Sequence, residues 1–133
     1  RFSNVRPSYI IHTRDYLKNN FGFKLKNKIE ALKDNPVELR NFFAFNKGIK
    51  GLAYKEASHF LRNIGFKGYA ILDKHILNSL IEFKVLDEIS MPLTSKNYYE
   101  IEQKIRIFSN EIQIPMDELD LLLWSRKNGR ILK

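Results

Sequence analysis

The chain has 133 residues and a mass of 15.8 kDa, and 44% of its side chains are apolar. This length supports one compact core and excludes two full domains. Lysine and arginine total 23 against 15 for aspartate and glutamate, so the net charge of +8 favours a polyanionic partner. The sequence contains no cysteine, which excludes disulfides, thiolate zinc sites, iron–sulfur clusters and cysteine nucleophiles from this chain.

Two further protein classes are excluded by composition. Aromatic residues make up 13% of the chain, more than a disordered basic tail carries. No apolar run approaches the roughly 18 residues of a membrane span, and no secretory leader is recognisable. We therefore expect a folded, soluble, cytoplasmic protein without a membrane partner. Because the first residue is Arg1 rather than Met, we also expect the chain to be part of a longer polypeptide.

Apolar residues recur at helical spacing almost throughout, which predicts an all-α fold. In chain order, the first two helices are expected after Pro7 and over residues 24–33. The next begins at Asn35, which can cap a helix whose first turn contains Pro36. We expect this helix to run to about Asn46.

The second half of the chain carries similar helix signals. A helix is predicted over residues 54–64, ending at Gly65, a residue type that favours the left-handed C-terminal cap. Asp73 stands where a helix N-cap belongs, before another apolar stripe. Two more helices are expected at about 95–108 and 115–127.

The loop at residues 47–53 joins two of these helices and contains two glycines. Backbone N–H groups at the start of a helix suit a DNA phosphate, and Gly48 and Gly51 allow close backbone approach. Lys47 and Lys50 add positive charge there. An ordinary glycine turn between two helices explains the loop equally well.

The helix after this loop has a polar face formed by Lys55, His59 and Arg62. The helix dipole disfavours a cation in the first turn, where Lys55 stands. Only a neutral amine attacks carbon, so this position suits a nucleophilic lysine. A solvated surface lysine is the plainer interpretation when Lys55 is considered alone.

Two segments together resemble a known family. They are GLAYKEASHFLRN at residues 51–63 and AILDKHI at residues 70–76. Both are similar to the helix-hairpin-helix DNA glycosylases, and most of all to the archaeal-type 8-oxoguanine DNA glycosylases. The tail, with LLLW at 121–124 and KNGRILK at 127–133, is also similar to that subfamily.

This resemblance implies a function and a catalytic pair. In the superfamily, the lysine just after the hairpin, which corresponds to the loop at residues 47–53, is the nucleophile. An aspartate about eighteen residues later is its partner. Lys55 and Asp73 have that spacing. The implied activity is that of a bifunctional DNA glycosylase/AP lyase, which excises 8-oxoguanine from duplex DNA through a Schiff base and β-elimination during base excision repair. Damaged double-stranded DNA is the implied partner, and we expect a monomer.

The resemblance also implies roles for other residues. Base recognition falls to side chains on two helices and at the chain end: His59, Asp120, Trp124 and Lys133. Without the resemblance, core packing is the plainer role for Trp124. Contacts to the DNA backbone fall mainly to the hairpin: Lys47, Gly48, Lys50, Gly51, Ala53 and His75. Ala53 stands where the superfamily often has glycine.

The implied fold is the helix-hairpin-helix glycosylase fold with its N-terminal helices missing, because family members carry further helices before the segment that matches Arg1. Residues 24–88 would form the helix-hairpin-helix subdomain, and residues 1–23 and 89–133 would belong to a second helical subdomain. With three histidines and no cysteine, no metal cluster is predicted, and His12 has no matching role. No cofactor is expected apart from a monovalent ion that hairpin carbonyls could hold.

Three alternatives stay open at this stage. A non-catalytic helix-hairpin-helix module would need the hairpin but not Lys55 with Asp73. A lyase for another oxidised base would need a different base pocket. A basic ribosomal or structural protein would explain the charge and make the lysine–aspartate spacing a coincidence.

Overall fold

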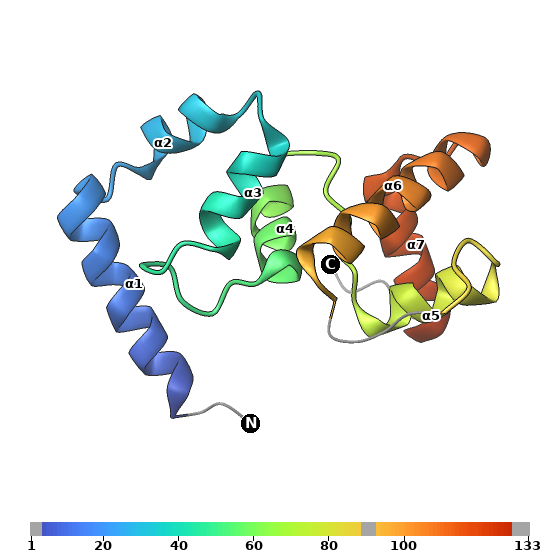
Figure 1. Cartoon of the computed structure of the whole chain (residues 1–133), viewed down its shortest axis with the longest axis horizontal. Helices are drawn as coiled ribbons and strands as arrows, with labels where there is room; N and C mark the ends of the chain where they lie inside the picture. Colours follow the sequence, from blue (N-terminus) through green and yellow to red (C-terminus); the bar gives the residue numbers. More distant parts are fainter. Residues whose placement is uncertain (1–3, 89–92, 129–133) are drawn as a thin grey trace. The chain divides into compact units, whose positions relative to one another are not determined.

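The computed structural model describes residues 4–88 and 93–128, and this part of the chain is helical with no strand, as Figure 1 shows. The all-α prediction is confirmed. The helices, in chain order, are α1 (Val5–Phe21), α2 (Leu25–Leu32), α3 (Pro36–Ala44), α4 (Tyr54–Asn63), α5 (Lys74–Glu82), α6 (Ser95–Glu111) and α7 (Met116–Asn128). The chain divides into two compact units, Arg1–Ala57 and Ser58–Lys133, with the division inside α4.

The N-terminal unit is built around α3, which buries Leu39 and Phe43. Helix α2 packs against α3. Aromatic rings link α1 to α3, since Phe21 at the end of α1 meets Phe42 edge-on with 6.0 Å between the ring centroids. No residue of α1 itself is buried, and Ile10 is 68% exposed.

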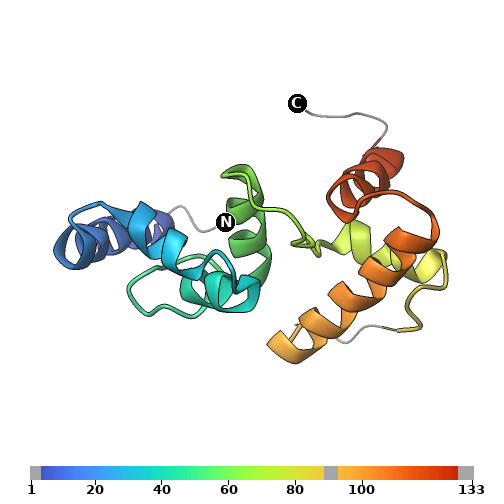
Figure 2. The same cartoon turned by 90° about the horizontal axis from the view of Figure 1, so that it is seen from above.

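The C-terminal unit consists mainly of α5, α6 and α7, with α7 packed against both other helices (Figure 2). Leu80, Ile105 and Leu119 provide one fully buried side chain from each of the three helices. At the surface, Arg126 on α7 donates to Glu82 on α5 at 2.5 Å. Apolar burial thus holds this unit together, with a surface ion pair joining α7 to α5.

Several helix-end predictions are confirmed. The Asn35 side chain accepts a hydrogen bond from the Glu38 N–H, and Gly65 has the left-handed backbone (φ +101°) that ends α4. The ends of α3 and α6 differ by two or more residues from expectation. Helix α3 stops at Ala44, because Asn46 turns the chain by accepting from the Gly48 N–H at 2.9 Å. Helix α6 continues to Glu111.

The subdomain boundaries implied by the resemblance, residues 24–88 with flanking parts 1–23 and 89–133, stay a prediction. The division at Ala57 is one of compactness and separates the chain at a different place. Each unit has its own buried side chains.

Gly48 generates a first prediction, because it is buried against the Tyr16 ring. A Cβ at this position would lie 2.2–2.4 Å from three ring carbons of Tyr16, and the backbone has no positive φ that itself requires glycine. We expect Gly48→Ala to lower the free energy of unfolding by about 1–3 kcal/mol, a typical cost of overpacking. The measurement is urea unfolding. In a Tyr16→Ala background the same substitution should cost much less, and an equal cost in both backgrounds would contradict this explanation.

Candidate functional site

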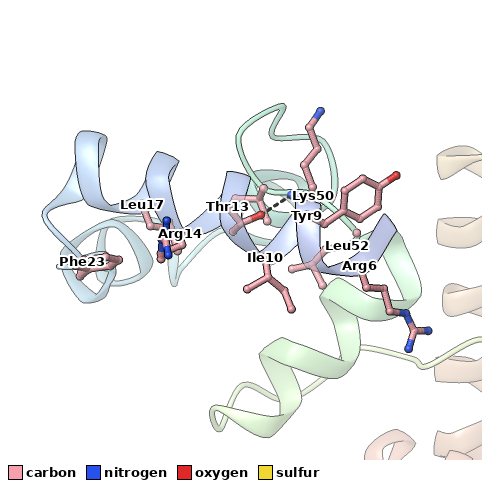
Figure 3. A pocket seen from close by; sticks show the side chains of 11 residues that line it. Arg6, Tyr9, Ile10, Thr13, Arg14, Leu17, Phe23, Lys50 and Leu52 are labelled. Atoms are coloured by element: carbon pink, nitrogen blue, oxygen red, sulfur yellow. Dashed lines mark hydrogen bonds between the residues drawn. The ribbon is translucent and has the colours of Figure 1, made fainter. Parts of the chain in front are cut away.

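The loop after α3 is anchored to α1 inside the N-terminal unit. The Lys50 N–H donates to Thr13 Oγ1 at 2.9 Å, as the dashed line in Figure 3 shows. His12 Nε2 lies 3.2 Å from the Lys47 carbonyl oxygen, which gives His12 a structural contact that the sequence did not indicate. The Lys47 and Lys50 side chains are exposed, and Figure 3 shows the Lys50 amine extending into solvent. The loop therefore has a fixed backbone and two accessible positive charges.

The last residues of this loop lead directly into α4. Among the described residues, the N–H groups of Gly51, Leu52 and Ala53 make no hydrogen bond, and the Ala53 carbonyl accepts from Ala57 in the first turn of the helix. Gly51 has φ +82°, a conformation that L side chains rarely adopt. These amides at a helix start can donate hydrogen bonds to an anion, whereas the Gly48 and Lys50 amides already donate within the chain.

A cavity of about 630 Å³ lies between α1 and this loop (Figure 3). Its lining includes apolar side chains from both sides, among them Tyr9, Ile10 and Leu52, together with the cations Arg6 and Arg14. The helical spacing of the α1 apolar residues predicted the helix, but it did not predict that Ile10 and Ile11 would be exposed.

Lys55 stands in the first turn of α4 with 46% of its side chain exposed. Its amine lies 3.1 Å from Glu56 Oε1, a surface ion pair that contributes little to stability. His59 follows one turn later and is exposed. The predicted nucleophile is therefore reachable from solvent.

Asp73 caps α5, as predicted from the sequence. Its Oδ1 accepts from the His75 N–H at 2.8 Å and the Ile76 N–H at 2.9 Å. Its Oδ2 has no partner among the described residues, and the side chain is half-buried. One oxygen thus holds the helix while the other remains available. The His75 side chain is exposed.

Lys55 belongs to the N-terminal unit and Asp73 to the C-terminal unit. Their catalytic pairing stays a prediction, and so does the contact of His75 with a phosphate. Within the described residues, no group of three or more histidine, aspartate or glutamate side chains could hold a metal ion.

Asp120 lies on α7 and forms a partly buried ion pair with Arg62 at the end of α4. Its Oδ2 also accepts from the Ile71 N–H at 3.3 Å. Arg62 donates in addition to the Asp117 carbonyl at 2.5 Å. Asp120 Oδ1 has no partner among the described residues, so one carboxylate oxygen is left for another donor.

Burial raises the pKa of the Asp120 carboxyl above its ordinary value. The charge and hydrogen bond of Arg62 lower it, as does the Ile71 N–H, and the Asp117 charge raises it. Desolvation is the largest of these effects, so the ion pair does not fully compensate the cost of burying the carboxylate.

Of the two remaining residues predicted for base recognition, the structure describes only one. Trp124 lies one turn after Asp120 on α7 and is half-buried, and Lys133 lies outside the described residues. Base recognition by His59, Asp120, Trp124 and Lys133 therefore stays a prediction. No helix among the described residues is both long and apolar enough to span a membrane.

Comparison with known proteins identifies the family. A family model described as 8-oxoguanine DNA glycosylase (Ogg-HhH) matches residues 1–114. The chain belongs to this family. Among curated relatives, an 8-oxoguanine DNA glycosylase/AP lyase of Fusobacterium nucleatum is 43% identical over 134 residues, and one of Methanocaldococcus jannaschii is 41% identical over 133 residues.

Solved structures of family members are also similar. The Methanocaldococcus jannaschii 8-oxoguanine glycosylase/lyase, in complex with a 15mer DNA containing 8-oxoguanine, gives a TM-score of 0.83 at 39% identity. The Thermotoga maritima 8-oxoguanine DNA glycosylase gives 0.79 at 33% identity. All of this chain is covered in each match, but it spans only about 60% of the length of these family members.

Two residues that the sequence did not single out hold the connection between α4 and α5. Tyr98 and Glu102 on α6 are almost fully buried and bond to the backbone of residues 70–72. One signal was available for Glu102, because this charged residue falls on the apolar stripe formed by Ile101 and Ile105. In this member of the family, polar side chains therefore shape the segment that leads to Asp73.

The Asp120 pKa gives a prediction about stability and pH. A carboxyl whose pKa is higher in the folded than in the unfolded state contributes stability below its unfolded pKa, and this contribution is lost as the pH rises through the folded pKa. The pH range concerned begins at about 3.8, the ordinary pKa of the carboxyl, and ends above the raised pKa of the folded chain. As the pH rises through this range, we expect the unfolding free energy of the unsubstituted chain to fall relative to that of Asp120→Asn. Urea unfolding at a series of pH values measures the difference.

Substitutions at two neighbouring residues serve as controls, because they should shift the Asp120 pKa in opposite directions. Arg62→Met should raise the Asp120 pKa further, and Asp117→Asn should lower it. Carbon-13 NMR titration of the Asp120 carboxyl follows both. If the difference in unfolding free energy between the unsubstituted chain and Asp120→Asn does not change with pH, the raised pKa of Asp120 is contradicted.

Proposed function

We propose that this chain carries the catalytic part of a bifunctional 8-oxoguanine DNA glycosylase/AP lyase acting in base excision repair. The observation that carries the proposal is Lys55, an accessible amine in the first turn of the helix that follows a basic, glycine-containing hairpin. The names of the family relatives support the same activity. The substrate would be damaged double-stranded DNA.

The hairpin would hold the DNA backbone. The N–H groups of Gly51, Leu52 and Ala53 are available among the described residues, and Lys47 and Lys50 supply positive charge beside them. Gly48 would act indirectly, because its packing against Tyr16 fixes the course of the loop. His75 would contact a phosphate near the lesion.

The chemistry would start with the damaged nucleotide rotated out of the duplex. Lys55 Nζ, in its neutral form, attacks C1′ of the deoxyribose, the C1′–N9 bond breaks, and the base leaves with the bonding electrons and takes up a proton. Opening of the sugar ring leaves a Schiff base between Nζ and C1′. Loss of a proton from C2′ then breaks the C3′–O bond, which cuts the strand on the 3′ side. Asp73 Oδ2 would stabilise the positive charge that develops on the sugar.

The base pocket would be formed by Asp120, Trp124, His59 and Lys133. Asp120 Oδ1 has no partner among the described residues, so it can accept from a purine N–H while Arg62 holds the other oxygen. The Trp124 ring offers a stacking surface one turn along α7. The terminal carboxylate of Lys133 would supply a further acceptor.

A monovalent ion at the hairpin remains part of the proposal. The carbonyl oxygens of residues 48–52 accept no hydrogen bond among the described residues, which fits a cation bound by backbone oxygens. We further propose that the protein is a monomer in the cytoplasm, where it reaches DNA.

The nucleophile assignment predicts a covalent complex. We expect borohydride to trap the 133-residue chain on DNA containing 8-oxoguanine, and Lys55→Gln to abolish this product, because glutamine cannot form a Schiff base. Denaturing gel electrophoresis measures the trapped fraction, across several lesions.

Lys96→Gln is the matched control, because it makes the same change at a lysine whose side chain is 84% exposed on α6. Trapping undiminished in Lys55→Gln would refute the nucleophile. DNA binding without any trapping by the unsubstituted chain would instead favour the non-catalytic module.

Lys133 generates a separate prediction about base recognition. Deleting this residue should slow excision of 8-oxoguanine by tenfold or more, about 1.4 kcal/mol, but slow nicking at a preformed abasic site far less. The abasic substrate has no base to recognise, so it is the internal control. Equal losses on the two substrates, measured under single-turnover conditions, would argue against a role for the tail in base recognition.

A further inference from the structure

The connection between α4 and α5 receives its hydrogen bonds from side chains of α6 and α7. Glu102 Oε1 accepts from the Ala70 N–H at 2.9 Å. The Tyr98 hydroxyl donates to the Ala70 carbonyl at 2.7 Å and accepts from the Leu72 N–H at 3.2 Å. Two residues on one face of α6 therefore fix the backbone on both sides of Ile71.

These contacts are in the interior of the C-terminal unit. Tyr98 is 3% exposed and Glu102 is 4% exposed. Burying a phenol and a carboxyl group is costly unless each makes hydrogen bonds, and apolar side chains could fill the same space without that cost. The Tyr98 hydroxyl also lies 3.5 Å from Ser58 Oγ, but the shorter hydrogen bonds of both residues go to the backbone of residues 70–72.

The segment that they fix leads directly to Asp73. The Asp73 N–H donates to the Ile71 carbonyl at 3.0 Å, so the start of the α5 cap depends on residues 70–72. Asp73 Oδ1 then accepts from the His75 and Ile76 N–H groups. A shift of this backbone would move the Asp73 carboxylate with it.

We propose that Tyr98 and Glu102 are positioning residues for Asp73: their bonds to residues 70–72 hold its carboxylate in the orientation that the reaction uses. This inference rests on the proposed role of Asp73 in catalysis. Neither residue touches the DNA in this scheme, and each acts through the backbone.

The test uses the 133-residue chain with substitutions that remove single polar groups. Tyr98→Phe deletes only the hydroxyl, Glu102→Met removes the acceptor, and Glu102→Gln keeps an acceptor oxygen for the Ala70 N–H. Ser109→Ala is the matched control, since it deletes another buried hydroxyl of α6, which donates to the Ile114 carbonyl at 2.5 Å.

The first measurement does not depend on activity. Hydrogen exchange followed by NMR should show faster exchange at the amides of Leu72, His75 and Ile76 in Tyr98→Phe, and unchanged exchange there in Ser109→Ala. Unchanged exchange at these amides in Tyr98→Phe would overturn the proposal, whatever the chain does to DNA.

The second measurement tests whether the effect passes through Asp73. The single-turnover rate of strand nicking at saturating abasic DNA should fall on the order of tenfold in Tyr98→Phe and Glu102→Met, with DNA affinity unchanged, because a small misplacement of a catalytic group costs this much or more. Glu102→Gln should restore most of the rate. In an Asp73→Asn background, Tyr98→Phe should have little further effect.

The outcomes separate this inference from the proposed function. Equal rate losses from Tyr98→Phe with and without Asp73, or an equal loss from Ser109→Ala, would overturn the positioning role. An Asp73→Asn variant with full activity would refute the catalytic role of Asp73 and with it a positioning role in the reaction. The exchange measurement would still show whether Tyr98 holds the α5 cap.

Discussion

The connection between α4 and α5 is held by side chains rather than by a helix or a sheet, and the place where α5 begins depends on this constraint. Buried backbone groups must find partners, and the amides of Gly68, Ala70, Ile71 and Leu72 find them on α6 and α7. These contacts fix the place where α5 starts. The helix packing of this unit and the position of the Asp73 carboxylate are therefore parts of one network.

The hairpin of the N-terminal unit is fixed in a different way. Small polar groups hold its first half, since Thr13 accepts from the Lys50 amide and Asn46 accepts from the Gly48 amide. Its second half, from Gly51 to Ala53, has amides without partners among the described residues. A loop with one bonded half and one available half can bind an anion with little loss of conformational entropy, because it is already ordered.

The sequence predicted the features that are determined locally. Asn35 and Asp73 act as caps because a cap bonds to amides two or three residues away, so its signal lies within one turn. It did not predict the partners of Tyr98 or Arg62, because Tyr98 meets Ala70 across 28 residues and Arg62 meets Asp120 across 58. Pairing at such separations depends on tertiary packing, which no local pattern records. Asp120 was identified by resemblance, while its ion pair with Arg62 became visible only in the structure.

Asp73 and Asp120 divide their two carboxylate oxygens in the same way. Each uses one carboxylate oxygen for protein contacts, the α5 cap for Asp73 and the Arg62 pair for Asp120, and the other oxygen has no partner among the described residues. A carboxylate held by one oxygen has lost most of its rotamer freedom before any substrate arrives, so its second oxygen can act with little further ordering cost. The contact that stabilises the fold and the contact proposed for catalysis or recognition are therefore compatible. Removing either carboxylate would remove both of its contacts at once. Its role in the reaction can be distinguished from its role in folding by substituting neighbouring residues instead. The suitable neighbours contact only the oxygen that makes the protein contacts, or the backbone beside it.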